Sequence, residues 1–235
     1  MRARGRGRVF VVALAAVLAL GSQGIFPGSG VQLASPVRAQ ETQGAGDEIS
    51  PKRHFQVDRP AELSNAAALT VYLRILDEMV SSYRLSEIEG AGTYRTWRRY
   101  NKTPYRSATH GERFVNNYAN TKAKAYGNYE GAGDMPVGSV LAKDSFAATN
   151  RGDVFFGPLF MMEKMPPGFS PESRDWRYTM VMPDGSLFGM TKGEGDRRVA
   201  FCVTCHKTAG NENDHLFFVP EEYRVRVYSV QPEEQ

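Results

Sequence analysis

The residues of this 235-residue chain that are best suited to chemistry lie at 202–206, where the sequence reads Cys-Val-Thr-Cys-His. Cys202 and Cys205 are its only cysteines. In a CxxCH pentad, each thiol can add to one vinyl group of a porphyrin, and the adjacent imidazole reaches the iron. The spacing therefore predicts one covalently attached haem c, with Cys202 and Cys205 as thioether donors and His206 as the proximal iron ligand.

Two other kinds of site also use closely spaced cysteines. A thioredoxin-type redox CxxC is the main alternative, but it gives no role to a histidine that directly follows the second cysteine. A structural zinc site needs four ligands, and the next histidine, His215, does not stand at a zinc-finger spacing. Because the chain has no third cysteine, a disulfide framework is excluded. We therefore interpret the pentad as a haem site.

Residues 1–39 have the layout of a secretory signal. Four arginines among the first eight residues precede an apolar run at 9–20, which is shorter than the roughly 20 apolar residues that span a bilayer. Val37-Arg38-Ala39 offers a small-residue cleavage site before Gln40, although it lies far from the apolar run, and an uncleaved membrane anchor is the alternative. Export to the periplasm agrees with the pentad, because bacteria attach haem c after export.

The charge of the mature chain gives no support to nucleic-acid binding. The leader holds five of the 29 basic residues and none of the 26 acids, so its removal takes the formal net charge from +3 to −2. No basic patch then argues for nucleic acid as a partner. Residues 40–60 are polar and lack periodicity, and we expect a flexible lead-in there. The remaining residues, 61–235, are enough for a single haem domain.

The hydrophobic pattern predicts an α+β fold. Between residues 61 and 89, apolar side chains such as Tyr72, Leu73 and Met79 recur at three- and four-residue steps, which predicts an N-terminal helix with one core-facing side. Beyond Gly92, short runs separated by turn residues predict a mainly antiparallel β-sheet, with the CxxCH motif near its C-terminal end. The expected strands are 113–118, 138–146, 154–165, 176–182, 187–190 and 216–219. Pro183-Asp184-Gly185 predicts a hairpin turn, and a helical turn is expected at 120–126.

The late position of the pentad narrows the kind of haem protein. Only 29 residues follow His206 and none is methionine, the last being Met190. Small electron-carrier cytochromes place CxxCH near the start and take a methionine ligand from downstream, so this chain cannot follow their pattern. Helical-bundle cytochromes with a late CxxCH match the position better, but this sequence is rich in strands after residue 92. An open distal coordination site is the natural inference.

Several stretches, taken in order with the late pentad, resemble the cytochrome P-460 family, which includes the β-sheet cytochromes c′. They are HGERFVNNYAN at 110–120, MPVGSVLAKD at 135–144, GPLFMMEK at 157–164 and DWRY at 175–178. The similarity covers about residues 94–225. It implies an exported monohaem protein, mostly antiparallel β-sheet and commonly homodimeric.

The resemblance leaves two functions open. Some family members oxidise hydroxylamine, which implies oxidation of hydroxylamine or a related small nitrogen compound and electron delivery to a periplasmic carrier. Others bind nitric oxide at a five-coordinate iron, which implies capture of nitric oxide or carbon monoxide for detoxification or sensing without turnover. A third reading is plain electron transfer with Met161 or His110 as an upstream sixth ligand; His215 is a further candidate for that position.

Lys143 is the main further candidate implied by the resemblance. Hydroxylamine-oxidising members carry a covalent bond from a lysine nitrogen to the porphyrin, and residues 138–143 are similar to the segment that supplies it. Such a lysine must lose its proton before it attacks, and burial against the haem would lower its pKa. The alternative is an ordinary solvated lysine like Lys122, Lys124 or Lys164. Because the β-sheet cytochromes c′ lack the modified chromophore, the cross-link itself stays open.

Three acids are candidates for proton transfer. The family's distal carboxylate lies shortly before the haem motif, so the resemblance points to Glu194 and Asp196, although a solvated turn explains both equally well. Glu163 lies on an expected strand that places Leu159 and Met161 on the same side. It can relay protons near the haem or pair with an arginine, because a buried unpaired carboxylate is costly.

The large aromatic residues are expected in the core. These residues are Trp97, Trp176 and the Phe155-Phe156 pair, because large aromatic side chains are usually buried. One of the two phenylalanines could instead cap the distal pocket together with Met161, where an apolar lid favours neutral diatomic gases.

Overall fold

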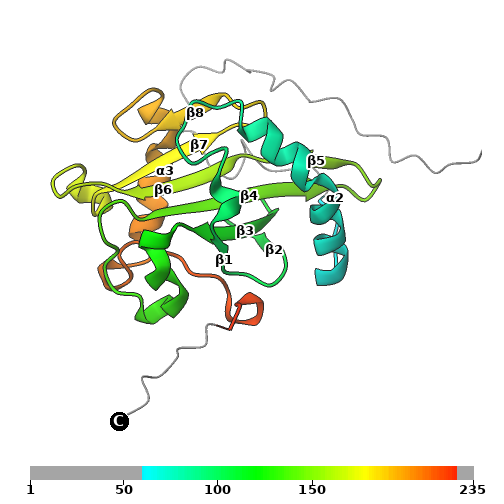
Figure 1. The fold of residues 1–235 in the computed structure, drawn as a ribbon, viewed down its shortest axis with the longest axis horizontal. Helices are drawn as coiled ribbons and strands as arrows, with labels where there is room; N and C mark the ends of the chain where they lie inside the picture. The colour runs from blue at the N-terminus through cyan, green and yellow to red at the C-terminus, as the bar shows by residue number, and fades with distance from the viewer. Residues whose placement is uncertain (1–59, 227–235) are drawn as a thin grey trace, which may run out of the picture. The chain divides into compact units, whose positions relative to one another are not determined.

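The computed structural model describes residues 60–226 (Figure 1). The predicted signal peptide at 1–39 and nearly all of the predicted lead-in at 40–60 lie outside the described residues. None of the helices between residues 60 and 226 combines the length and the apolar character needed to cross a membrane.

The centre of the described part is one eight-stranded sheet, and every strand pair in it is antiparallel. The hydrogen-bonded order is β1-β3-β4-β6-β7-β8, with β2 also paired to β3 and β5 to β4. The strands are β1 (Arg98–Arg99), β2 (Tyr105–Ser107), β3 (Arg113–Ala119), β4 (Val140–Ala148), β5 (Val154–Phe156), β6 (Leu159–Lys164), β7 (Trp176–Val181) and β8 (Leu187–Met190). The predicted α+β class with a mainly antiparallel sheet is confirmed.

Two of the strand predictions were wrong. The single strand expected at 154–165 is divided into β5 and β6 at Gly157-Pro158, where proline lacks the N–H that a ladder needs. A side chain at position 157 would also meet Ser145 Oγ at 2.1 Å, so only glycine fits. Residues 216–219 form no strand and pair with none in the described chain. The hairpin of β7 and β8 around residues 183–185 is confirmed.

Two α-helices and several short 3₁₀ helices accompany the sheet. The α-helices are α2 (Asn65–Tyr83) and α3 (Asp196–Lys207), and the 3₁₀ helices are η1 (Tyr94–Thr96), η2 (Thr121–Gly131), η3 (Pro171–Ser173), η4 (Asn211–Asn213) and η5 (Glu221–Tyr223). Helix α2 lies within the span where periodicity predicts a helix, and Ser64 caps its first turn by accepting from Ala67 N at 3.3 Å. Helix α3, which carries the CxxCH motif, was not predicted.

The two α-helices cover opposite faces of the sheet. Helix α2 packs through Tyr72, Ile75 and Met79 on the face that includes Ala142 and Met161. Leu73, which the sequence pattern also placed in this stripe, is instead 61% exposed. Helix α3 lies against β7 and β8, behind the sheet in the view of Figure 1. Because side chains alternate along a strand, neighbouring residues of β4 belong to different layers.

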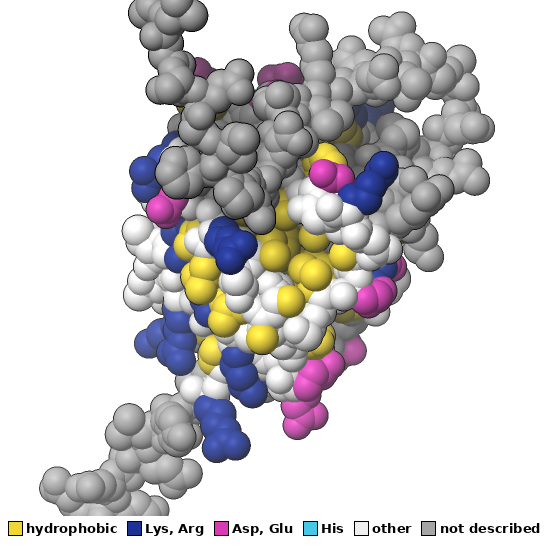
Figure 2. Space-filling model, turned by 90° about the vertical axis from the view of Figure 1, so that its right-hand side faces the viewer, with side chains coloured by type: hydrophobic (Ala, Val, Ile, Leu, Met, Phe, Trp, Pro, Cys, Tyr) yellow, Lys and Arg dark blue, Asp and Glu magenta, His cyan; other side chains and the backbone are white. Residues whose placement is uncertain are grey.

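Hydrophobic side chains are also exposed on the side of the molecule shown in Figure 2, where they gather between basic and acidic ones. The most exposed large hydrophobic residues in the described chain are Leu85, at 74%, and Leu73 on α2. Such surfaces are common in proteins that associate. The expected homodimer stays a prediction.

Candidate functional site

A cavity of about 240 Å³ lies between α3 and the sheet face that α3 covers. Its lining includes Phe201, Cys202, Cys205 and His206 from α3, Asn117, Leu141, Lys143, Phe160, Met162 and Tyr178 from the sheet, Thr109, His110 and Gly111 from the turn before β3, and Leu216 and Phe217 from the C-terminal segment. We call this space the α3 cavity. It brings the three pentad residues, Lys143 and His110 together, although they come from three separate parts of the chain.

The helical conformation of the pentad places its reactive groups on one side. Cys202, Cys205 and His206 stand at positions i, i+3 and i+4 of α3, and these positions share a helix face. Burial raises the pKa of the Cys202 thiol to about 12, with the neighbouring Cys205 adding to the rise. A redox-active CxxC needs a thiol of lowered pKa, typically at a helix N-terminus. The middle of α3 therefore favours attachment over thioredoxin-type chemistry.

His206 is held in one orientation by the backbone. Its Nδ1 lies 3.0 Å from the carbonyl oxygen of His215, and its ring packs 5.1 Å from Tyr178 and 5.4 Å from Phe217 between centroids. Since a carbonyl can only accept, Nδ1 carries the proton and Nε2 keeps its lone pair. Burial lowers the pKa of His206 to about 4, with the charge of Lys143 contributing further. The ring is thus a neutral imidazole with Nε2 unpaired, as an iron ligand must be.

Lys143 lies on the sheet wall of the same cavity. It pairs with Asn117 of β3 and Phe160 of β6 in the ladder, and its side chain is half-buried. Within the described chain its amine has no hydrogen-bond or ion-pair partner, and burial lowers its pKa to about 8 although Cys205 acts in the opposite direction. The other lysines nearby differ, since Lys122 and Lys124 are exposed and Lys164 bonds Asp214. The ordinary-lysine alternative therefore does not describe Lys143.

His110 is the second titratable group on the side of the cavity away from α3. Its Nδ1 lies 2.8 Å from Ser107 Oγ and 3.2 Å from Thr109 Oγ1, and its ring meets Phe160 edge-on at 4.7 Å between centroids. Burial, and then the charge of Lys143, hold the pKa of His110 well below its ordinary value. Its Nε2 has no partner among the described residues. The imidazole is therefore neutral near pH 7 and has one nitrogen free toward the cavity.

The three acids proposed from the sequence lie elsewhere. Glu194 and Asp196 are exposed, and Asp196 accepts from Lys192 N at 3.0 Å in the turn that starts α3. Glu163 shares a sheet face with Leu159, as expected, but that face is the one covered by α2, where Glu163 pairs with Arg177. Among the described residues, no aspartate or glutamate lines the α3 cavity. The structure does not bring these acids to the pentad.

The aromatic wall also differs from the sequence expectation. Phe156 packs with the α2-side core, and neither it nor Phe155 lines the α3 cavity. Phe160 is the β6 ring that does, and it was not among the predicted site residues. Strand alternation could have identified Phe160. It places Phe160 and Met162 on one face of β6 and Met161 on the other, where Met161 packs in the α2-side core. Both tryptophans are core residues, as expected: Trp97 packs with the α2-side core and Trp176 is fully buried under α3.

The side chains of the α3 cavity fit a porphyrin held by the pentad. Two cysteines and one imidazole nitrogen face a space with mainly apolar walls, and the imidazole is already oriented by the hydrogen bond of its other nitrogen. Within residues 60–226, no group of three or more His, Cys, Asp or Glu side chains could hold a metal ion alone. The zinc alternative therefore lacks its ligands in this part of the chain. No protein-family model matches the chain, and no curated protein matches it either.

Proposed function

We propose that the chain is an exported monohaem c-type cytochrome of P-460 type, which oxidises hydroxylamine or a related small nitrogen compound at an open haem iron and passes the electrons to a periplasmic carrier. One observation carries the proposal: Lys143 and the CxxCH side chains line a single cavity from facing walls. The amine of Lys143 has no partner in the described part of the chain, and burial lowers its pKa to about 8. A lysine nucleophile needs these two properties before it can bond to a porphyrin carbon.

The cavity residues have separate roles in this proposal. Cys202 and Cys205 would hold the porphyrin through thioethers formed by addition of each thiol to a vinyl group, and His206 Nε2 would bind the iron. Lys143 would add a third covalent link from the sheet side, in which its nitrogen replaces a hydrogen on a porphyrin carbon, and the two electrons and two protons released would go to a two-electron oxidant such as peroxide. Once bound, the haem supplies a coordination site for the substrate nitrogen and a route for electrons. The apolar side chains around it, among them Met162, keep water out of the site.

His110 is the group we propose for proton transfer. Oxidation of hydroxylamine releases protons with its electrons, so a base must lie near the substrate. When Nδ1–H donates to Ser107 Oγ, Nε2 of His110 carries a free lone pair and can accept a proton. The lowered pKa keeps this nitrogen unprotonated at neutral pH. His110 takes the role that was expected of Glu194 and Asp196.

The proposal is tested by turnover of the haem-loaded protein with hydroxylamine and an artificial electron acceptor. We expect turnover in the unmodified protein, a loss of about 100-fold in His110→Asn, as is typical for removal of a general base, and no change in Glu194→Gln. Equal loss in both variants, or loss only in Glu194→Gln, would contradict the role of His110. A low-spin six-coordinate ferrous spectrum that becomes five-coordinate in His110→Asn would make His110 an iron ligand and the protein an electron carrier.

One observation favours a second candidate function, the capture of nitric oxide or carbon monoxide without turnover. The described walls of the α3 cavity contain no carboxylate, and the rings of Phe160, Phe201 and Phe217 face it. Such walls favour neutral diatomic gases over water and anions. A protein that binds nitric oxide at a five-coordinate iron, yet shows no electron transfer from hydroxylamine, would support this candidate and overturn the first.

A further inference from the structure

The backbone that holds His206 is in an unusual conformation. Asp214 and His215 are consecutive residues with φ of 51° and 58°, in the left-handed region that side chains other than glycine rarely adopt. The His215 carbonyl that accepts from His206 Nδ1 belongs to this turn. Two such residues in sequence are strained, and they persist only when their surroundings hold them in place. The structure shows what holds them.

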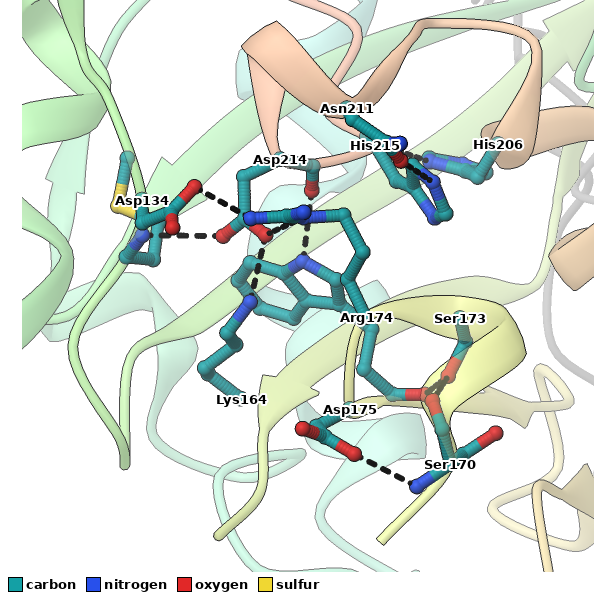
Figure 3. Close-up of polar contacts among 12 residues, drawn as sticks. Asp134, Lys164, Ser170, Ser173, Arg174, Asp175, His206, Asn211, Asp214 and His215 are labelled. Carbon is teal, nitrogen blue, oxygen red and sulfur yellow. Dashed lines mark hydrogen bonds and ion pairs between the residues drawn. The ribbon is translucent and has the colours of Figure 1, made fainter. Parts of the chain in front are cut away.

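Asp214 is fully buried and is the centre of a group of contacts that we call the Asp214 clamp (Figure 3). Its carboxylate accepts from Lys164 Nζ at 2.5 Å and Arg174 Nε at 2.9 Å through Oδ1, and from Met135 N at 2.9 Å through Oδ2. Its backbone carbonyl accepts from Trp176 Nε1 at 2.8 Å. The clamp therefore joins the turn to the sheet and to two loops.

Hydrogen bonds also hold the His215 side chain and its backbone N–H. His215 Nε2 lies 3.0 Å from Asn211 Oδ1, and His215 N donates to Gly210 O at 3.1 Å. The positive charge of Arg174 is shared with Asp134 at 2.6 Å, so two acids balance two bases. A buried ionic group of this kind is weak evidence for stability alone, because desolvation offsets much of its attraction. Its position, one residue from the His215 carbonyl, suggests another role.

We propose that the Asp214 clamp is a positioning device, which aims the His215 carbonyl at His206 Nδ1 and thereby sets how strongly His206 binds the haem iron. A firm hydrogen bond at Nδ1 draws the proton toward the carbonyl and makes Nε2 a stronger ligand. Loosening the clamp lets the turn relax from its left-handed conformation, and the hydrogen bond then weakens. Lys164, Arg174 and Asp214 act on the iron only through His215 and His206. The inference rests on the proposed function, because it requires iron at His206.

The test uses the haem-loaded protein with Asp214→Asn, Arg174→Gln and a control, Arg177→Gln. Arg174 and Arg177 are matched, since each exposes 29% of its side chain and each pairs with a carboxylate. Arg177, however, pairs with Glu163 on the α2 side of the sheet. Both clamp variants should lower the iron–histidine stretching frequency in the resonance Raman spectrum of the ferrous protein. They should also favour reduction about tenfold, which is roughly 59 mV for one electron.

The control should leave both signals unchanged, and Arg174→Lys should restore most of the Arg174→Gln effect. Because Asp214→Asn can fail to fold, Arg174→Gln, at a partly exposed position, decides the outcome. A lower melting temperature with an unchanged stretching band and potential would show that the clamp is only structural and would overturn the inference. A wild-type protein that carries no haem would overturn the proposed function instead. The absorption spectrum of the wild-type protein shows whether haem is bound before any variant is compared.

Discussion

Lys143 and Asp144 are consecutive charged residues of β4 that point to opposite faces of the same sheet, and their surroundings differ completely. Asp144 is fully buried on the α2 side and accepts from Tyr72 at 2.7 Å, Tyr94 at 3.0 Å and Asn116 at 2.9 Å. Lys143, on the α3 side, has no partner among the described residues and faces a cavity.

The comparison separates a structural charge from a reactive one. A buried charge normally lies in a complete set of hydrogen bonds, as Asp144 does, because an unpaired one is costly. Lys143 is an exception to this rule, and the cavity that it faces is also lined by His110 and His206, whose Nε2 atoms have no partner among the described residues either. The groups without partners around the α3 cavity, in contrast to the Asp144 network on the other face, support the proposal that the chemistry takes place in the cavity.

The largest expected effect on stability comes from removing the Asp144 carboxylate, which has a complete set of hydrogen-bond donors. In Asp144→Ala, three buried donors lose their acceptor, and at about 1 kcal/mol or more each the free energy of unfolding should fall by roughly 3 kcal/mol or more. Urea unfolding monitored by circular dichroism measures this loss. The absorption spectrum of the protein that remains folded should not change. A stable Asp144→Ala protein with an altered chromophore would reverse the roles of the two faces.

Lys143→Met should have the opposite pattern. Methionine fits the apolar cavity, so the unfolding free energy should change by less than about 1 kcal/mol. The cross-linked chromophore should disappear, leaving an ordinary haem c spectrum, and turnover with hydroxylamine should fall about tenfold to 100-fold. Lys124→Met, which removes an exposed lysine, is the control and should match the wild type in both. A Lys143→Met protein with an unchanged spectrum would show that no cross-link forms.

The pH dependence of turnover sharpens the comparison further. Burial is the main cause that holds the pKa of His110 well below 6.5, so its Nε2 is unprotonated at pH 7 and gains a proton only in more acidic solution. Turnover should therefore stay constant as the pH falls through 6.5, and should drop about tenfold per unit only below the lowered pKa. A pH–rate profile checks this. An acid limb centred near 6.5, or one that persists in His110→Asn, would contradict the role of His110.

The smallest expected effect comes from two tyrosines, one on each side of the sheet, which form a closely matched pair. Tyr72 donates to Asp144 and lies 2.6 Å from the hydroxyl of Tyr118, whereas the buried hydroxyl of Tyr178, on the cavity side, has no partner within residues 60–226. Tyr72→Phe should lower the unfolding free energy by about 1 kcal/mol, and Tyr178→Phe should leave it unchanged or raise it slightly. Paired urea titrations decide this, and equal losses would remove the distinction between the faces.

Local patterns made much of the sheet predictable. The predicted strand 113–118 matches β3 nearly residue for residue, and β4, β7 and β8 agree with their predictions within two residues. These predictions succeed because side-chain alternation and turn residues are patterns among neighbouring positions in the sequence. Helix α3 was missed for a local reason as well. It begins in a charged, glycine-containing stretch and buries only Val199 fully, so it has little apolar periodicity to detect.

The site was only partly predictable. The pentad is visible in the sequence because its chemistry depends on spacing, and Lys143 was found by resemblance. The clamp of Asp214 by Lys164 and Arg174, the carbonyl of His215, and the placement of His110 and Phe160 depend on contacts between segments far apart in the chain. Proximity to the pentad in sequence favoured Glu194 and Asp196, but the turn before α3 leaves both exposed.

The central claim is that one porphyrin is held from both walls of the α3 cavity, and mass spectrometry of the digested mature protein tests it most directly. The account predicts a single haem joined to the peptide that contains Cys202 and Cys205 and also to the peptide that contains Lys143. The same digest of Lys143→Met should carry haem on the cysteine peptide alone. A wild-type digest with no haem on the cysteine peptide would contradict the account entirely, and haem on that peptide without Lys143 would contradict the cross-linked chromophore.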